Sequence, residues 1–165
     1  MDCPDCVDAG REGMADDLLA FIPNVSVNID NPRYGILLHQ CVSRIPKSGI
    51  PIQLETRIRL KSKGSLPGVV GLTTFLVEGY SSRGSKRGAI GLHTVTFYTR
   101  LLSQLSDKAV MAVMAHELAH AWLNEHIRPE ASKRREEDAD LLAEMWGFEP
   151  ELRALSEETE PLIAD

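Results

Sequence analysis

His116-Glu117-Leu118-Ala119-His120 is the most informative stretch of this sequence of 165 residues. On an α-helix, residues four positions apart lie one above the other on the same face. His116 and His120 would therefore aim their imidazoles at one point in space, which is half of a zinc site. Glu117 would project from the adjoining part of that face, close enough to act on a water molecule without binding the metal itself.

The residues around this stretch predict a helix from about Ser106 to His126. Ser106 or Asp107 can cap its start, Asp107 suits the positive end of the helix dipole, and Pro129 follows its end. Apolar residues recur at steps of three and four, so we expect one packed side with the histidines at its edge. These residues are Val110, Val113, Met114, Leu118, Ala121 and Trp122. The alternative is a pair of core histidines with a surface glutamate between them, because short motifs also arise by chance.

A third metal ligand is expected further along, because catalytic zinc usually takes three side chains and keeps one position open. A second helix is predicted over about residues 132–146. Within it Glu136 and Asp140 share a face, so Glu136 can bind the metal while Asp140 holds a histidine by its other ring nitrogen. Glu137 and Asp138 are alternative ligands, although an acidic first turn that complements the helix dipole also explains them.

Three ligands and a neighbouring glutamate predict a zinc-dependent metallopeptidase that hydrolyses peptide bonds in protein substrates. In this reading Zn²⁺ is bound by His116, His120 and Glu136, and Glu117 is the general base that acts on metal-activated water. The alternative is a non-catalytic interaction module stapled by zinc, which a fourth protein ligand would indicate.

With these residues the chain resembles the gluzincin metallopeptidases, in which an HExxH helix precedes a helix carrying a Glu-x-x-x-Asp ligand and brace. Residues 116–123, 136–137 and 142–146 look like the C-terminal peptidase domain of the DA-one family, the LIM-containing, ubiquitin-activated peptidases of plants. Upstream, residues 3–8 look like the closing Cys-x-x-Cys of the zinc module that precedes this domain in that family.

This resemblance implies a zincin-like fold and a protein-cleaving zinc enzyme, with the ligands and base named above. One departure is Asp140, which stands where the family has a glutamine-like position and returns the chain to the general gluzincin pattern. The sequence contains no ubiquitin-interacting helix and no complete LIM module, so ubiquitin dependence is not expected to transfer.

The remaining segments predict an α+β fold, with a small mixed or antiparallel sheet packed on the HExxH helix and the ligand helix that follows it. A first helix is indicated before Pro23, and a mixed segment follows Asn31-Pro32. Strands are expected at residues 25–29, 53–60, 69–77 and 89–98. The strand at residues 69–77 is either a sheet edge that accepts an extended peptide or a core strand without substrate contact.

A second electrophile should hold the oxyanion during hydrolysis, and the sequence does not identify it. His93, Tyr98 and Tyr80 are candidates, although each is also a common kind of structural residue.

The cysteines offer a second metal site. Cys3 and Cys6 form one Cys-x-x-Cys pair, and a complete structural zinc site would need His39 and Cys41 to come back to it. The other interpretation is that residues 1–8 are a remnant of an upstream zinc module and that Cys41 is a small buried residue. Residues 9–165 would then form the metallopeptidase domain.

The composition is that of a compact globular enzyme, with 43% apolar and 25% charged residues and a net charge of -6. This charge argues against a nucleic-acid surface, so the expected partner is a protein or peptide substrate. We find no apolar stretch long enough for a membrane and no export signal, and a cytoplasmic location is expected. The acidic residues 157–160 are interpreted as a frayed end.

Overall fold

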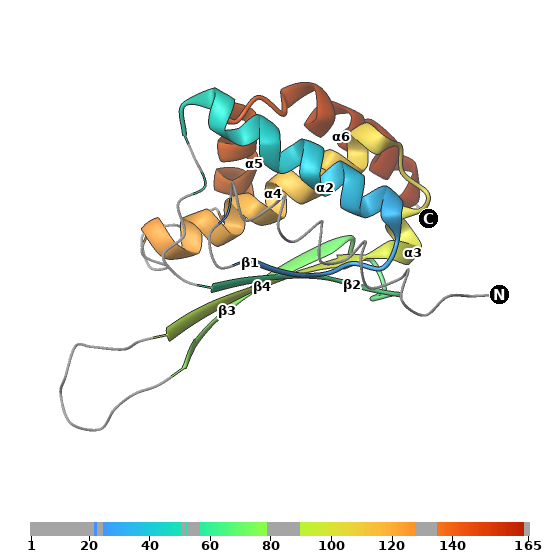
Figure 1. The fold of residues 1–165 in the computed structure, drawn as a ribbon. Helices are drawn as coiled ribbons and strands as arrows, with labels where there is room; N and C mark the ends of the chain where they lie inside the picture. The colour runs from blue at the N-terminus through green and yellow to red at the C-terminus, as the bar shows by residue number, and fades with distance from the viewer. Residues whose placement is uncertain are drawn as a thin grey trace, which may run out of the picture.

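The computed structural model describes residues 22, 25–50, 52, 57–78, 90–127 and 135–163. They form the expected α+β fold, in which the helices lie on one side of a small sheet (Figure 1). The elements are β1 (Val25–Asn28), α2 (Pro32–Arg44), a 3-10 turn (Ile45–Ser48), β2 (Arg57–Lys63), β3 (Gly71–Glu78), β4 (Ile90–Tyr98), α3 (Thr99–Leu102), α4 (Asp107–His126), α5 (Arg135–Met145) and α6 (Glu149–Ile163). None of the described helices combines the length and the apolar character needed to cross a membrane. The predicted helix before Pro23 and the pair Cys3 and Cys6 lie outside the described residues.

The sheet has four strands in the order β1-β2-β4-β3, and it is mixed. β1 pairs parallel to β2, β2 pairs parallel to β4, and β3 runs antiparallel to β4 with Gly71 opposite Phe97. β4 lies in the interior of the sheet and buries Val95 and Phe97 against the helices. β3 is therefore an edge strand, and its outer edge has no strand partner among the described residues.

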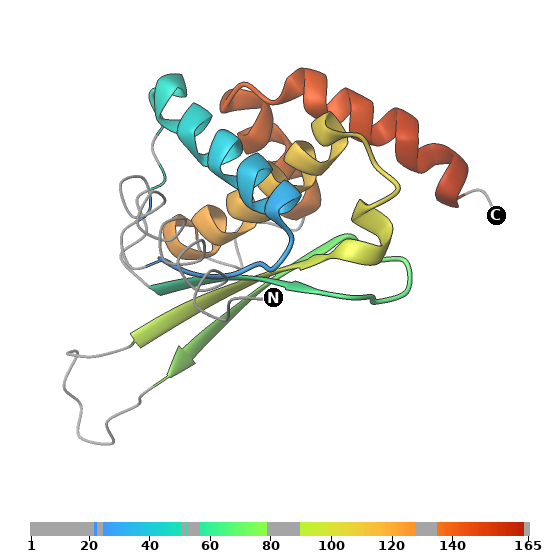
Figure 2. The same ribbon diagram turned by 45° about the vertical axis from the view of Figure 1, so that its right-hand side comes forward.

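Helix α4 is the centre of the helical layer, because it contacts β3, β4, α2, α5 and α6. In Figure 2, α4 is the yellow-to-orange helix, which lies among the other helices on one side of the sheet. The expected cap is present, since Ser106 Oγ accepts a hydrogen bond from Ala109 N at 3.3 Å. The expectation of one packed side is wrong, because Met111, Ala112 and Ala115 are buried as well. A helix with neighbours on most of its circumference needs apolar residues all round rather than a stripe.

Helix α2 replaces the mixed segment expected after Asn31-Pro32. Asn31 Oδ1 accepts a hydrogen bond from Arg33 N at 2.9 Å, and Pro32 occupies the first turn, which is a common start for a helix. The buried residues of α2 are Tyr34, Gly35, Leu37, Leu38, Cys41 and Val42. Their spacing is helical, so the signal was present in the sequence.

The acidic residues 157–160 belong to helix α6, so the frayed end expected there is wrong. Glu158 Oε1 accepts from Ser106 N at 2.8 Å, and Glu158 Oε2 accepts from Ser106 Oγ at 2.6 Å. A carboxylate at the N-terminus of a helix is favoured by the helix dipole and by its free N–H groups. Glu158 of α6 thus caps the start of α4, about fifty residues earlier in the sequence.

Helix α5 ends in a tight turn that sets the direction of α6. Gly147 has a left-handed φ of 97°, Gly147 N donates to Glu144 O at 2.9 Å, and Phe148 N donates to Ala143 O at 3.0 Å. These two bonds close the helix in the arrangement that favours glycine. The buried side chains of Trp146 and Phe148 then anchor the turn in the core.

Candidate metal centre and its cleft

Three side chains from α4 and α5 converge on one point. His120 Nε2 lies 3.0 Å from His116 Nε2, and Glu136 Oε2 lies 3.0 Å from His116 Nε2. Glu136 Oε1 lies 3.1 Å from His120 Nε2. All three residues can offer one ligand atom within 4.8 Å of the others, and they are the group that sequence reasoning selected.

The donor set suits a divalent ion of the zinc type. Ligand atoms about 2.0–2.2 Å from a tetrahedral ion lie roughly 3.3–3.6 Å from one another. The observed separations of 3.0–3.1 Å are a few tenths of an ångström shorter, so a small outward shift of the side chains would admit the ion. Two imidazole nitrogens and a carboxylate oxygen are also the ligand types that zinc prefers. Burial is the main cause that lowers the pKa of His120, and a lowered pKa favours the neutral imidazole that binds metal.

Asp140 fixes the orientation of His116. His116 Nδ1 donates a hydrogen bond to Asp140 Oδ1 at 2.7 Å, since a carboxylate can only accept. With the proton on Nδ1, the lone pair of Nε2 faces His120 and Glu136. One turn of α5 separates Glu136 from Asp140, so a single helix supplies both the carboxylate at the centre and the carboxylate behind the histidine.

Glu117 of α4 packs against strand β3. Thr73 Oγ1 lies 2.6 Å from Glu117 Oε2 and 3.0 Å from Glu117 O, so the hydroxyl joins β3 to both the side chain and the backbone of this residue. Gly71 makes the approach possible, because a Cβ there would lie 2.8 Å from Glu117 Cγ. Only 6% of Glu117 is exposed. Burial raises the pKa of the Glu117 carboxyl, and the Thr73 hydroxyl opposes this shift.

A cleft of about 270 Å³ opens beside Glu117 and the centre. Its walls come from the start of β3, the cleft-facing side of α4 and the start of α5. The lining residues are Gly71, Leu72, Thr73, Glu117, His120, Asn124, Arg135 and Glu136. The arrangement provides a buried carboxylate, converging metal ligands and a sheet edge in one place.

The candidates for an oxyanion-stabilising residue do not line this cleft within the described part of the chain. His93 is buried on β4 and lies 3.7 Å from Glu125 Oε1. Burial lowers the pKa of His93, with Glu125 opposing the shift. Tyr98, the last residue of β4, borders a different pocket, and Tyr80 lies outside the described residues.

Cys41 is the small buried residue that one of the two interpretations expected. It is fully buried in α2, and its Sγ lies 3.9 Å from Met111 O of α4. Burial raises the pKa of its thiol far above the usual range. The enclosed position of Cys41 agrees with its interpretation as a small core residue, and a second metal site at Cys3 and Cys6 stays a prediction.

Besides Leu72, four residues that line the cleft were not predicted from the sequence. Asn124 stands one turn beyond His120, so the same four-residue step could have found it. Gly71, Thr73 and Arg135 carried no comparable signal, because their places depend on how β3 and the start of α5 pack against α4.

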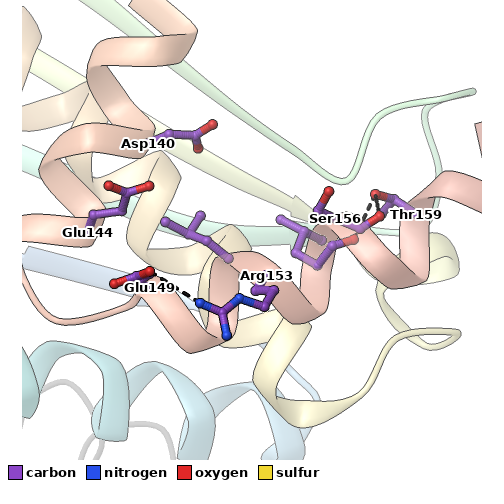
Figure 3. A pocket seen from close by; sticks show the side chains of 8 residues that line it. Asp140, Glu144, Glu149, Arg153, Ser156 and Thr159 are labelled. Carbon is purple, nitrogen blue, oxygen red and sulfur yellow. Dashed lines mark hydrogen bonds and ion pairs between the residues drawn. The ribbon is translucent and has the colours of Figure 1, made fainter.

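A second pocket of about 480 Å³ lies between α5 and α6, as Figure 3 shows. Asp140 and Glu144 border it from α5, and Arg153 pairs with Glu149 at 3.2 Å on α6. This pocket meets the metal centre only through Asp140, which lines the pocket and holds His116.

The converging side chains form a group that could hold a metal ion, on an α+β fold. Residues 83–152 match the family model described as Peptidase family M48, and this segment contains β4, α4, α5 and the beginning of α6. The match supports a zinc metallopeptidase family, with proteins or peptides as substrates. No curated protein and no solved structure shows a significant match to the chain.

Proposed function

We propose that this protein is a zinc-dependent metallopeptidase of the HExxH…ExxxD gluzincin type. His116, His120 and Glu136 would bind the zinc ion, and Asp140 would hold His116 in the ligating tautomer. The observation that carries the proposal is the convergence of these three side chains within 4.8 Å beside the buried carboxylate of Glu117.

Each residue has a separate part in the proposed reaction. Zinc, when bound, would lower the pKa of water and polarise the scissile carbonyl. Glu117 would take the proton from the attacking water and deliver it to the leaving amine, so that the peptide bond breaks to a carboxylate and an amine. Thr73 would keep Glu117 pointed along the cleft rather than out to solvent.

The zincin-like part of the fold prediction belongs to this proposal. An extended peptide would pair with the free edge of β3 and cross the cleft above the metal centre. β3 supports this because it is an edge strand and its first residues line the cleft.

The non-catalytic zinc module is the weaker alternative. A structural site is usually closed by a fourth protein ligand, whereas the group found among the described residues has three members. A structural zinc site also needs no buried glutamate such as Glu117 beside it, lining a cleft.

The resemblance to the DA-one peptidase domain stays a prediction, as does the cytoplasmic location. The family match covers the residues that carry the resemblance around the metal centre. It does not distinguish DA-one-like peptidases from other zinc metallopeptidases.

Glu117→Gln tests the proposed function most directly. The variant should bind zinc and fold like the wild type, while cleavage of labelled casein or of a peptide library falls by about two to four orders of magnitude. Chelation should abolish wild-type cleavage and added zinc should restore it. Glu137→Gln, which changes an exposed glutamate next to Glu136, is the matched control and should keep its activity. A zinc-loaded Glu117→Gln protein with full activity would remove the proposal.

A further inference from the structure

We propose that Arg135, held in place by Asn124, forms an anion subsite that binds a carboxylate of the peptide substrate. The inference rests on the proposed peptidase function and adds to it a preference for substrates with a negative charge near the scissile bond.

The two residues come from the elements that build the metal centre. Asn124 lies on α4 one turn beyond His120, and Arg135 is the first residue of α5, directly before Glu136. Arg135 Nη1 donates a hydrogen bond to Asn124 Oδ1 at 2.5 Å. Both side chains line the cleft that also contains Glu117 and His120. The guanidinium is thus fixed beside the centre rather than free to move through solvent.

The guanidinium of Arg135 forms no ion pair with the described residues of the cleft. Within the described part of the chain no carboxylate lies within ion-pair distance of Arg135, and its partner Asn124 is neutral. The two cleft carboxylates are engaged elsewhere, since Glu136 faces the histidines and Glu117 faces Thr73. A half-buried cation with a neutral partner is the arrangement that a ligand carboxylate completes.

Arginine is suited to this use because its planar fork presents five N–H donors and can bind a carboxylate through two of them. The hydrogen bond to Asn124 uses one donor on one side of the fork. A peptide lying between β3 and α5 would bring either an acidic side chain or its free C-terminal carboxylate to the remaining donors. Both sources have the same chemistry, and the first would give a sequence preference while the second would give release of residues from the C-terminus.

Peptide hydroxamates test the subsite without turnover, because the hydroxamate binds zinc directly and the adjoining residue probes the cleft. Three matched probes should be titrated into zinc-loaded protein by calorimetry: one with a glutamate amide, one with a glutamine amide, and one with a glutamine and a free C-terminus. We expect wild type to bind one or both charged probes about tenfold more tightly than the neutral amide. The probe that gains affinity identifies the source of the carboxylate.

Arg135→Gln should remove this difference, and Arg135→Glu should reverse it in favour of a lysine amide probe. Arg153→Gln, on the exposed side of α6, is the matched control and should keep the wild-type preference. Zinc affinity and Tm are measured for every variant. If Arg135 only fastened α5 to α4, Arg135→Gln would weaken zinc binding or all probes equally, and that result would overturn the subsite.

Equal affinity of wild type for all three probes would also overturn the subsite while leaving the peptidase proposal intact. Failure of the zinc-loaded wild type to cleave any peptide would instead count against the peptidase proposal, and the probe affinities would still judge the role of Arg135.

Discussion

The pocket between α5 and α6 and the cleft beside α4 are linked through Asp140, which lines the pocket and holds His116 of the metal centre, but the two differ in the side chains that they contain. The pocket between α5 and α6 is the larger, at about 480 Å³ against about 270 Å³ for the cleft beside α4. Its carboxylates, on Asp140, Glu144 and Glu149, are all exposed, and Glu149 pairs with Arg153 (Figure 3). In the cleft, one carboxylate is buried and another faces two imidazoles.

We take the convergence of metal-ligand atoms, rather than pocket volume, as the mark of the proposed site. Exposed carboxylates on a helix surface are hydrated, so their mutual repulsion contributes little to the free energy of folding. Nitrogen and oxygen lone pairs that meet within 4.8 Å repel one another unless a proton or a cation lies between them. Protein packing therefore has to hold the cleft residues together, and the hydrogen bonds from Thr73 and to Asp140 contribute to this.

Asp140 tests the comparison most strongly, because it lines the larger pocket and also holds His116. Asp140→Asn should weaken zinc binding by about 10–100-fold, since the residue behind a liganding histidine fixes its tautomer and raises its basicity. The measurement is a competition titration against a chromophoric chelator, with peptidase activity followed in parallel. Unchanged zinc affinity in a folded Asp140→Asn protein would mean that His116 needs no support from α5.

The sequence alone was sufficient for the parts of the site that lie within one helix. The spacing of His116 and His120, and of Glu136 and Asp140, follows helix geometry, and the structure brings all four together. The ends of α4 were also readable, because Ser106 and the residues after it have local capping preferences.

Contacts between elements far apart in the sequence could not be read in this way. Thr73 lies 44 residues before Glu117, and its position depends on the pairing of β3 with β4. Glu158 lies 52 residues after Ser106, so its hydrogen bonds to the start of α4 could not be predicted from local sequence. The acidic segment was therefore interpreted as a solvated end. Helix α2 differs from these contacts, because its start at Asn31 and Pro32 follows local helix-start preferences. A helix could therefore have been predicted there in place of a mixed segment.

Thr73 offers a smaller test on the cleft side. Thr73→Val removes the hydroxyl that contacts Glu117 but keeps a β-branched side chain on β3, so kcat should fall by about tenfold while zinc affinity stays unchanged. Thr73→Ser should restore most of the activity, because it returns the hydroxyl. Steady-state kinetics on one fluorogenic peptide distinguish a loss in kcat from a change in KM.

Gly71→Ala serves as the steric counterpart of Thr73→Val. The new Cβ would meet Glu117 Cγ at 2.8 Å, so Glu117 has to move away from β3 and activity should fall without loss of zinc. Full activity in both variants would show that Glu117 does not need its seat on β3.

Glu144→Gln should have the smallest effect, and it defines the limit of the site on α5. Glu144 follows Asp140 by one turn and borders the same pocket in Figure 3, but it is exposed and makes none of the contacts described at the metal centre. Substitution of such a surface residue usually changes free energies by less than about 0.5 kcal/mol, so zinc affinity should stay within about twofold of wild type. The chelator titration used for Asp140→Asn checks this. A fall of about tenfold would extend the metal centre into the larger pocket, since that corresponds to more than 1 kcal/mol from an exposed side chain.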